Sequence, residues 1–257
     1  MRISRVELEG LNARFQSAEP LDILRFAHAT FGRRAAILTS MQRAGTTLCY
    51  LADRAGLDFD VLFVDTGVLH QETLATRDHL AMTHRNLRVR TLTPERTFLQ
   101  QTGDEGVLYL SREGQERCCD LRKTAPLRAV RGEYDALIGA LRKDEGGARA
   151  AVEPFGLDPE MNALRVHPFA SVTNDDLEGV ASRIPDLVVN PLHSMGFTTI
   201  GCFPCTTPVL PGEPDRAGRW RHLASVEYCG INPIDRGRGG EIDLADRYAE
   251  PLGLPAA

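Results

Sequence analysis

The sequence predicts an α/β fold, a mostly parallel sheet with flanking helices. Short apolar runs of the buried-strand type, such as 35–38 and 61–64, alternate with longer segments whose apolar residues recur at helical spacing. Polar turns rich in glycine and hydroxyl groups close the first two runs. Strands that alternate with helices in this way are typical of βαβ units, so the chain is expected to build a parallel sheet.

The individual elements follow in order along the chain. Five strands are predicted, at 35–38, 61–64, 87–92, 135–138 and 164–166. Helices are predicted over 19–31, from the turn at 39–45 through about Ala55, and over roughly 70–82. The triplet Thr93-Pro94-Glu95 is expected to begin a further helix. Residues 142–149 are expected to form a loop at the carboxyl edge of the sheet, because they are too polar for a core.

Prolines and glycines dominate from Asn190 onward, which predicts an irregular C-terminal segment. The chain has 257 residues, 42% of them hydrophobic, and contains neither an internal repeat nor a convincing linker. This length suits one compact domain over 1–257, in which 231–257 would be a C-terminal tail that is either mobile or docked.

The composition excludes several classes of partner. A formal net charge of -5 gives no overall attraction to nucleic acid or to an anionic membrane, so any anionic ligand must be held by locally clustered Arg and Lys. The N-terminus is too polar for a signal peptide, and no apolar run approaches the roughly 18 residues of a membrane helix. We therefore expect a cytoplasmic protein. The sequence does not define the oligomeric state, and a homo-oligomer is compatible with it.

Two loops have the placement of ligand-binding loops in parallel sheets. Residues 40–45, beginning with Ser40, follow the first predicted strand, and Asp65-Thr66-Gly67 follow the second. Ligands of such sheets bind beyond the carboxyl ends of the strands, where backbone N–H groups face anions. Each loop alone is equally typical of ordinary turns, and neither a P-loop nor a GxGxxG pattern is present.

The cysteines carry a stronger signal. Cys118 and Cys119 are adjacent, and Cys202 and Cys205 form a C-x-x-C pair. In a reducing compartment, two close pairs of thiols indicate a zinc ion or an iron-sulfur cluster. Zinc knuckles usually separate the ligands of each pair by two to four residues, so the adjacent pair favours a cluster and leaves zinc as the alternative. Cys49 lies among apolar residues and is expected in the core.

Several segments together resemble one enzyme family. CCDLRKTAPL at 118–127, NPLHSMGFTTIGCFPCT at 190–206, GEPDRAGRW at 212–220 and the late Cys229-Gly230 are similar to the assimilatory sulfonucleotide reductases. The double Cys with C-x-x-C resembles the iron-sulfur branch of that family, the adenylylsulfate (APS) reductases. FVDTG at 63–67 matches in the same order. The resemblance implies an adenine-nucleotide α-hydrolase-like fold, related to that of PP-loop ATP pyrophosphatases.

The resemblance also implies roles for individual residues. Cys118, Cys119, Cys202 and Cys205 match the four ligands of a [4Fe-4S] cluster, and Lys123 matches a lysine near both cluster and substrate. The residues that match anion-binding positions for phosphate and sulfate are Arg142, Arg149, Arg216 and Arg219. Cys229 matches the nucleophile, whose thiolate attacks the sulfur of APS. AMP leaves, and thioredoxin or a similar dithiol then releases sulfite from the enzyme S-sulfocysteine.

Elementary chemistry agrees with these roles. An anionic nucleophile that approaches an anionic substrate meets charge repulsion, which fixed cations offset. The same cations would lower the pKa of a nearby cysteine. Three alternatives remain open at this point: a reductase that prefers phosphoadenylylsulfate (PAPS) or accepts both nucleotides, a PP-loop ATP pyrophosphatase, and a non-catalytic iron-sulfur sensor.

The chain departs from the family pattern in three places. The nucleotide loop, SFxAED in many relatives, reads SMQRAG at 40–45 and lacks the acidic pair. The family's LRRxQS loop reads LRKDEG here, which lowers its positive charge and favours APS over the more anionic PAPS. Around Cys229 the usual TECGLH reads VEYCGIN, without the histidine.

Overall fold

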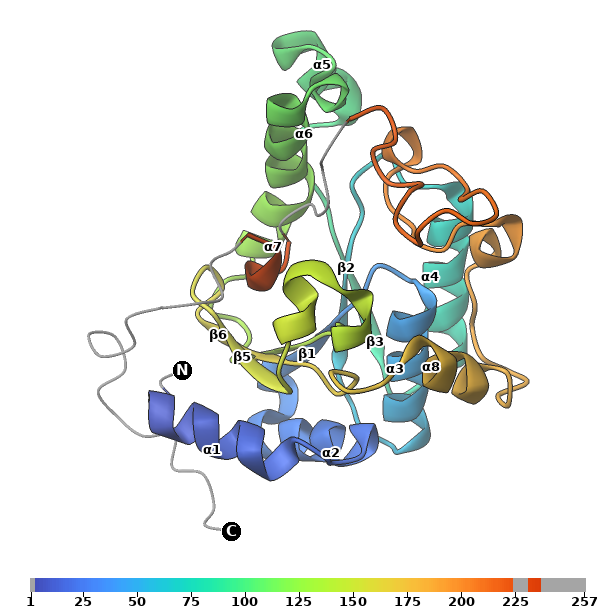
Figure 1. Ribbon diagram of the computed structural model, residues 1–257. Helices are drawn as coiled ribbons and strands as arrows, with labels where there is room; N and C mark the ends of the chain where they lie inside the picture. Colours follow the sequence, from blue (N-terminus) through green and yellow to red (C-terminus); the bar gives the residue numbers. More distant parts are fainter. Residues whose placement is uncertain (1–2, 224–230, 237–257) are drawn as a thin grey trace.

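The computed structural model describes residues 3–223 and 231–236 (Figure 1). Its strands are β1 Ala35–Leu38, β2 Asp60–Val64, β3 Arg88–Leu92, β4 Ala136–Ile138, β5 Phe155–Asp158 and β6 Ala163–Val166. Its α-helices are α1 Arg5–Phe15, α2 Pro20–Phe31, α3 Arg43–Arg54, α4 Gln71–Thr83, α5 Phe98–Glu105, α6 Arg112–Cys119, α7 Ala125–Arg128 and α8 Asn174–Ala181. The rest of the described chain is irregular or forms short 3₁₀ and π turns.

The strands form one sheet in the order β3-β2-β1-β4-β6-β5. All neighbouring pairs are parallel except β5 and β6. The chain builds outward from β1 in one direction through β2 and β3, and later in the other direction through β4. The strand order therefore reverses between β1 and β4, and such a switch point is where open α/β sheets bind their ligands.

Helices cover the two faces of the sheet unequally. Ile37 of β1 and Phe63 of β2 belong to the larger core, together with buried residues of α1, α2, α3, α4 and α8. Ala36 and Leu62, the neighbours of those residues along the strands, face a smaller core with Leu127 of α7. This alternation follows from the two-residue period of side chains on a strand. The described helices include none long and apolar enough to cross a membrane.

The predicted α/β fold is confirmed, and the five predicted strands are present with small shifts at their ends. The sequence did not predict β5, a four-residue antiparallel strand that contains Gly156. Helices α1, α6, α7 and α8 were also missed. The helix expected at Thr93-Pro94-Glu95 begins later, at Phe98, because Thr97 and Gln100 form a capping box there. The polar loop 142–149 forms two 3₁₀ turns.

A buried histidine follows β6. His167 is 5% exposed, and burial lowers its pKa to about 3, with a further contribution from the positive charges of Arg165 and Arg149. The imidazole is therefore neutral in the native protein at pH 7. In the unfolded chain its pKa returns to about 6.5, so the unfolded state binds the extra proton as the pH falls.

The contribution of neutral His167 to the free energy of unfolding should therefore be complete above pH 6.5 and be lost as the pH falls toward 3. His167 alone should contribute a loss of about 2 kcal/mol between pH 7 and pH 5. Urea denaturation at both pH values measures this loss. We expect His167→Gln to remove about that part of the pH dependence, whereas the exposed control His79→Gln should retain it. An unchanged pH dependence in His167→Gln would contradict the assignment.

Candidate active site

The loop after β1 makes a tight turn into α3. Thr39 is buried, and its hydroxyl accepts a hydrogen bond from the Met41 N–H at 3.1 Å. Met41 itself has a φ of +59°. Gly45, in the first turn of α3, packs directly on this threonine, because a Cβ at Gly45 would lie 2.1 Å from Thr39 Oγ1. The absence of a side chain at Gly45 therefore lets the loop and the helix N-terminus meet closely.

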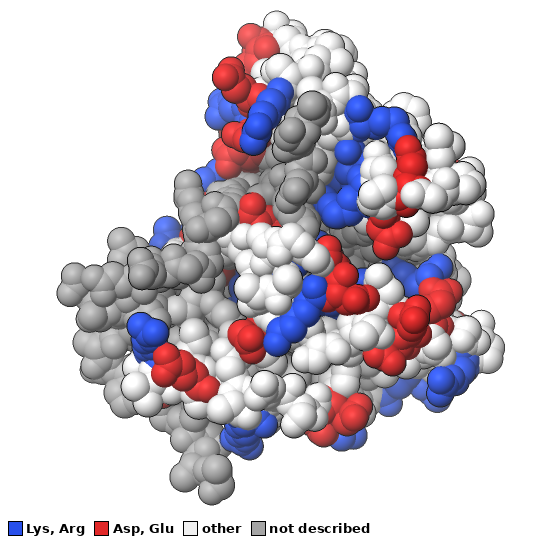
Figure 2. Space-filling view, in the orientation of Figure 1, with Lys and Arg blue, Asp and Glu red and all other residues white. Residues whose placement is uncertain are grey.

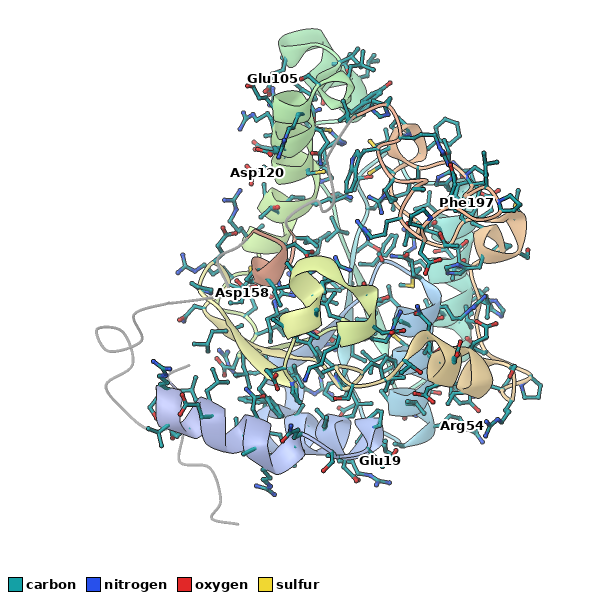
Figure 3. The ribbon with its side chains drawn as sticks, viewed as in Figure 1. Glu19, Arg54, Glu105, Asp120, Asp158 and Phe197 are labelled. Carbon is teal, nitrogen blue, oxygen red and sulfur yellow. The ribbon has the colours of Figure 1, made fainter. Side chains whose placement is uncertain are left out.

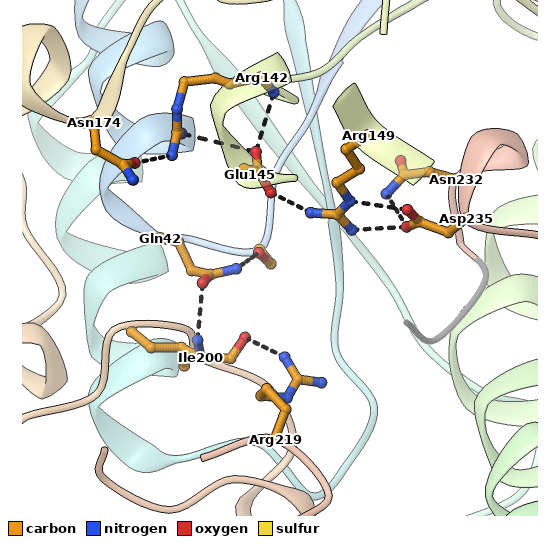
Figure 4. Close-up of polar contacts among 10 residues, drawn as sticks. Gln42, Arg142, Glu145, Arg149, Asn174, Ile200, Arg219, Asn232 and Asp235 are labelled. Carbon is orange, nitrogen blue, oxygen red and sulfur yellow. Dashed lines mark hydrogen bonds and ion pairs between the residues drawn. The ribbon is translucent and has the colours of Figure 1, made fainter. Parts of the chain in front are cut away.

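Two contacts tie this loop to the irregular C-terminal segment. The Arg43 N–H donates to His193 Nε2 at 3.1 Å, and His193 Nδ1 lies 2.9 Å from the Phe197 carbonyl. The ring is therefore neutral with its proton on Nδ1, in agreement with its pKa, which burial lowers. The Gln42 side chain donates to Ser40 Oγ and accepts from the Ile200 N–H (Figure 4). The loop after β1 and the segment 193–200 therefore lie side by side and form one wall of the site.

A cavity of about 540 Å³ opens at the switch point between β1 and β4. It contains seven of the residues that the sequence assigns to the site: Ser40, Thr66, Lys123, Arg142, Arg149, Arg216 and Arg219. Figure 2 shows Lys and Arg side chains gathered in the recess between helices α5 and α6 and the segment beyond residue 190, with Asp and Glu close by. The volume and the cationic lining suit an anionic ligand of nucleotide size.

The other two predicted residues of the loop after β2 do not line this cavity. The carboxylate of Asp65 accepts from the Gly67 N–H at 2.8 Å and so closes the turn. Gly67 has a φ of +73°, and a Cβ there would lie 3.0 Å from Arg122 Nη2. Asp65 and Gly67 therefore shape the turn that carries Thr66.

Of the four predicted arginines of the cavity, Arg142 and Arg149 are already engaged by carboxylates or amides (Figure 4). Arg142 donates to the Asn174 side chain at 2.5 Å and lies 3.8 Å from the Glu145 carboxylate. Arg149 is bound by Glu145 on one side and by Asp235 on the other. Glu145 therefore stands between the two guanidinium groups and reduces the net charge of this part of the cavity.

The cations on the opposite side come from 216–219 and from Lys123. Arg219 donates to the Ile200 carbonyl at 3.1 Å, and its guanidinium lies 4.3 Å from the centre of the Trp220 ring. Trp220 is 1% exposed, and its backbone has a φ of +46°, which is rare for a bulky residue. Such a conformation requires support from its surroundings, and the Trp220 N–H supplies part of it by donating to the Cys205 carbonyl at 2.9 Å.

The four clustered cysteines line a second, smaller cavity. Cys118 and Cys119 end α6, which continues into a π-helical turn at Asp120–Thr124. Such turns are frequent at functional sites. Cys202 precedes the 3₁₀ turn Phe203–Cys205, and Cys205 ends it. A bridge between Leu69 and Cys202 fixes this turn next to the loop after β2. Figure 3 shows sulfur atoms in the space between α6 and the segment beyond residue 190.

The two cavities share a wall. Lys123 and Trp220 line both of them, so the thiols and the cationic cavity are separated by one layer of side chains. Burial raises the pKa of the Cys118 thiol, and it raises the pKa of the Cys205 thiol to about 12. Without a metal these thiols would be neutral, whereas coordination deprotonates a thiol. Within 3–223 and 231–236, no three His, Cys, Asp or Glu side chains converge as ligands of a single metal ion.

Three buried polar side chains around the thiols were not predicted from the sequence. Gln101 and Gln115 are each 1% exposed, and their amides donate to Cys118 Sγ at 3.6 Å and to Cys119 Sγ at 3.2 Å. Arg122 is 3% exposed and donates to the Gln101 side chain at 3.0 Å and to the Thr66 carbonyl. Because an arginine only donates, the Gln101 oxygen must face Arg122 and its NH₂ must face Cys118.

The sequence had one usable signal for these residues. Arg122 is adjacent to Lys123 in the segment CCDLRK, which the resemblance already singled out. The two glutamines stand in no motif, and only the packing of α5 and α6 brings them to the sulfurs. Cys229, the predicted nucleophile, lies outside the described residues.

Comparisons with known proteins agree with the fold and with this site. Residues 34–208 match the phosphoadenosine phosphosulfate reductase domain. An adenosine 5'-phosphosulfate reductase from Streptomyces coelicolor is 36% identical over 84% of this chain and 89% of its own length. The chain therefore belongs to the sulfonucleotide reductase family, and its APS reductase relatives identify the branch.

Two solved structures share the fold. A phosphoadenylyl-sulfate reductase from Candida auris superposes with a TM-score of 0.69 at 17% identity and covers 80% of this chain and 99% of its own. An FMN adenylyltransferase from Candida glabrata superposes with a TM-score of 0.53 at 10% identity and covers 86% and 75%. Both likenesses confirm the predicted adenine-nucleotide type of α/β fold.

The close packing of Gly45 on Thr39 leads to a prediction. Gly45→Ala should force the threonine out of the turn and lower the free energy of unfolding by about 1–3 kcal/mol, the usual range for overpacking. Gly10→Ala is the matched control, because a Cβ at Gly10, also inside a helix, meets nothing within 4 Å. It should be neutral or stabilising by up to about 1 kcal/mol. Equal stability of the two variants in urea denaturation would contradict the packing.

Proposed function

We propose that this protein reduces APS to sulfite and AMP, using electrons from thioredoxin or a similar dithiol protein in the cytoplasm. The observation that carries the proposal is the shared wall between a cationic cavity of nucleotide size and a cavity lined by four thiols. The relatives named adenosine 5'-phosphosulfate reductase support the choice of reaction.

The cationic cavity suits the substrate. The N-terminus of α3 and the turn at Ser40 end in the cavity, where backbone N–H groups favour a phosphate. Arg142 on one side and Arg216 and Arg219 on the other supply positive charge for the sulfate and phosphate groups. We assign the substrate to this cavity, with Thr66 at its floor and Lys123 next to the thiols.

The donor set in the smaller cavity fits an iron-sulfur cluster. A tetrahedral zinc site needs all four sulfurs about 2.3 Å from one point. The four thiols line one cavity, but two of them are adjacent in sequence, whereas zinc knuckles usually separate the ligands of each pair by two to four residues. A four-iron cluster gives each thiolate its own iron and so tolerates ligands that stand further apart. The buried indole N–H of Trp220, which has no acceptor among the described residues, would also find one in a cluster sulfur.

We therefore propose that Cys118, Cys119, Cys202 and Cys205 hold a [4Fe-4S] cluster. When bound, it would order the two cysteine segments and add its charge to the local field without a required change of redox state. The protein's own groups then orient it, because Gln101, Gln115 and Thr66 lie within hydrogen-bonding distance of three of the four sulfurs.

Cys229 is proposed as the nucleophile. Two peptide units join it to Ile231, a reach of at most about 7 Å, and Ile231 lines the larger cavity. Its thiolate would attack the sulfur of APS, forming an S–S bond while the S–O bond to the phosphate of AMP breaks. The product is AMP and an S-sulfocysteine. A thiolate of the partner dithiol then attacks Cys229 Sγ and sulfite leaves, which gives a mixed disulfide. The second thiol attacks the partner's sulfur in that bond and releases Cys229 as a thiolate, so that the dithiol is oxidised to a disulfide by two electrons.

The charge of the cavity favours APS over PAPS. Glu145 lies between Arg142 and Arg149, and Asp235 binds Arg149 as well. These carboxylates leave less positive charge for the additional phosphate of PAPS. The ratio of kcat/KM for the two nucleotides measures the preference, and a ratio in favour of PAPS would reverse this part of the proposal.

The test of the reaction is the variant Cys229→Ser. We expect it to lose sulfite release from APS by at least about a thousandfold, because a serine hydroxyl is a far weaker nucleophile than a thiolate at neutral pH. The visible absorbance of the purified protein should remain. Cys49→Ala is the control, since Cys49 is a buried core residue of α3 whose burial raises its pKa. Full turnover by Cys229→Ser would require another nucleophile.

A further inference from the structure

The N-terminus of α3 lines the larger cavity but is not capped by its own N-cap residue. Gln42 occupies the N-cap position, and its side chain makes no capping hydrogen bond. It bonds Ser40 and the Ile200 N–H instead (Figure 4). The first N–H groups of a helix have no acceptor within the helix, so the Arg43 N–H needs one from elsewhere. The first turn of α3 contains no acidic residue that could serve.

His193 supplies this acceptor from 150 positions away. Its Nε2 accepts from the Arg43 N–H at 3.1 Å, while its Nδ1 lies 2.9 Å from the Phe197 carbonyl. A carbonyl oxygen only accepts and a backbone N–H only donates, so the neutral ring with its proton on Nδ1 is the form that makes both bonds. Arg43 and His193 both line the larger cavity. The irregular C-terminal segment therefore caps the helix whose N-terminus the cavity contains.

A protonated ring would break this contact. With protons on both nitrogens, Nε2 could not accept, and an added positive charge would lie at the positive end of α3. Burial lowers the pKa of His193, the charge of Arg43 lowers it further, and the bond to the carbonyl opposes only part of the shift. Arg43 is itself paired with Glu178 of α8, and α4 presents the neutral Thr73 to Asn190, next to the 3₁₀ turn that carries the ring. The ring is therefore neutral at pH 7 and takes up a proton as the pH falls through a pKa below its usual value of about 6.5.

We propose that His193 is a positioning residue for the substrate, which as a neutral cap holds the loop 40–43 and the N-terminus of α3 in the conformation that binds the nucleotide. Without the cap, part of the binding free energy would be used to order this loop. The loss should therefore appear in KM, whereas the chemical step of the bound substrate should be little changed. This inference rests on the proposed function, because APS is assigned to this cavity.

Two variants of the holoenzyme separate the acceptor from the charge. His193→Leu removes the acceptor and leaves the Arg43 N–H unpaired. At pH 7.5 we expect its KM for APS to rise about tenfold while kcat for sulfite release stays within about twofold. Hydrogen exchange of the amides in 40–46 should become at least about tenfold faster. His193→Gln keeps a neutral acceptor near the position of Nε2, so its KM and exchange rates should stay within about threefold of the wild-type values.

The pH dependence of KM distinguishes this role from a merely structural one. The wild-type KM for APS should rise at least about twofold more than that of His193→Gln between pH 7.5 and pH 5, because the glutamine does not titrate. Taking the ratio of the two KM values at each pH cancels the titration of groups that both proteins share. The control is His79→Gln, which removes an exposed histidine of α4 and should follow the wild type at every pH.

Either of two results would overturn the proposal. A wild-type KM in His193→Leu would mean that the cap does not matter for substrate binding. A KM of His193→Gln that follows the wild-type pH dependence would mean that another group titrates, and this comparison decides the matter if His193→Leu does not fold. If the wild-type protein forms no sulfite from APS, the proposed function fails by itself, while the exchange rates of 40–46 in the variants still decide whether His193 caps α3.

Discussion

The buried guanidinium of Arg122 is the constraint around which the site is built. It joins the loops after β2 and β3 to α5 through the Thr66 carbonyl, the Arg96 carbonyl and the Gln101 side chain. Burial lowers its pKa, and the nearby sulfurs of Cys118 and Cys202 oppose that shift. A buried cation whose hydrogen-bond partners are neutral is costly. Thiolates close to Arg122 would compensate its charge, and a bound metal cluster would keep those thiols deprotonated.

This arrangement connects the cofactor site with the substrate site. Arg122 and Lys123 are successive residues of the π-helical turn after the cysteine pair, so that one turn contributes to both cavities. Trp220, held at positive φ, forms the opposite part of the shared wall. The loop after β2 holds Thr66 between the two sites, with Asp65 and Gly67 closing its turn. A change in the cysteine segments would therefore be transmitted to the cationic cavity through few side chains.

The sequence predicted the parts of this structure that depend on local pattern. Apolar runs gave five strands, and the pairing of Cys118-Cys119 with Cys202 and Cys205 is supported by their common cavity. The local pattern did not predict β5, because its short antiparallel pairing with β6 is fixed by partners outside the strand. Gln101, Gln115 and Arg122 were missed because their contacts depend on tertiary packing. The pairing of Arg149 with Asp235 could not be read either, since 86 positions separate the two residues.

The central claim is that four clustered thiols, two of them buried, hold an iron-sulfur cluster beside an anion-binding cavity. Iron, zinc and acid-labile sulfide content of the anaerobically purified protein, together with its optical spectrum, tests this claim most directly. The account predicts a brown protein with about four irons and four sulfides per chain, and loss of both in a Cys118→Ser, Cys119→Ser double variant. A colourless protein with one tightly bound zinc per chain would contradict it.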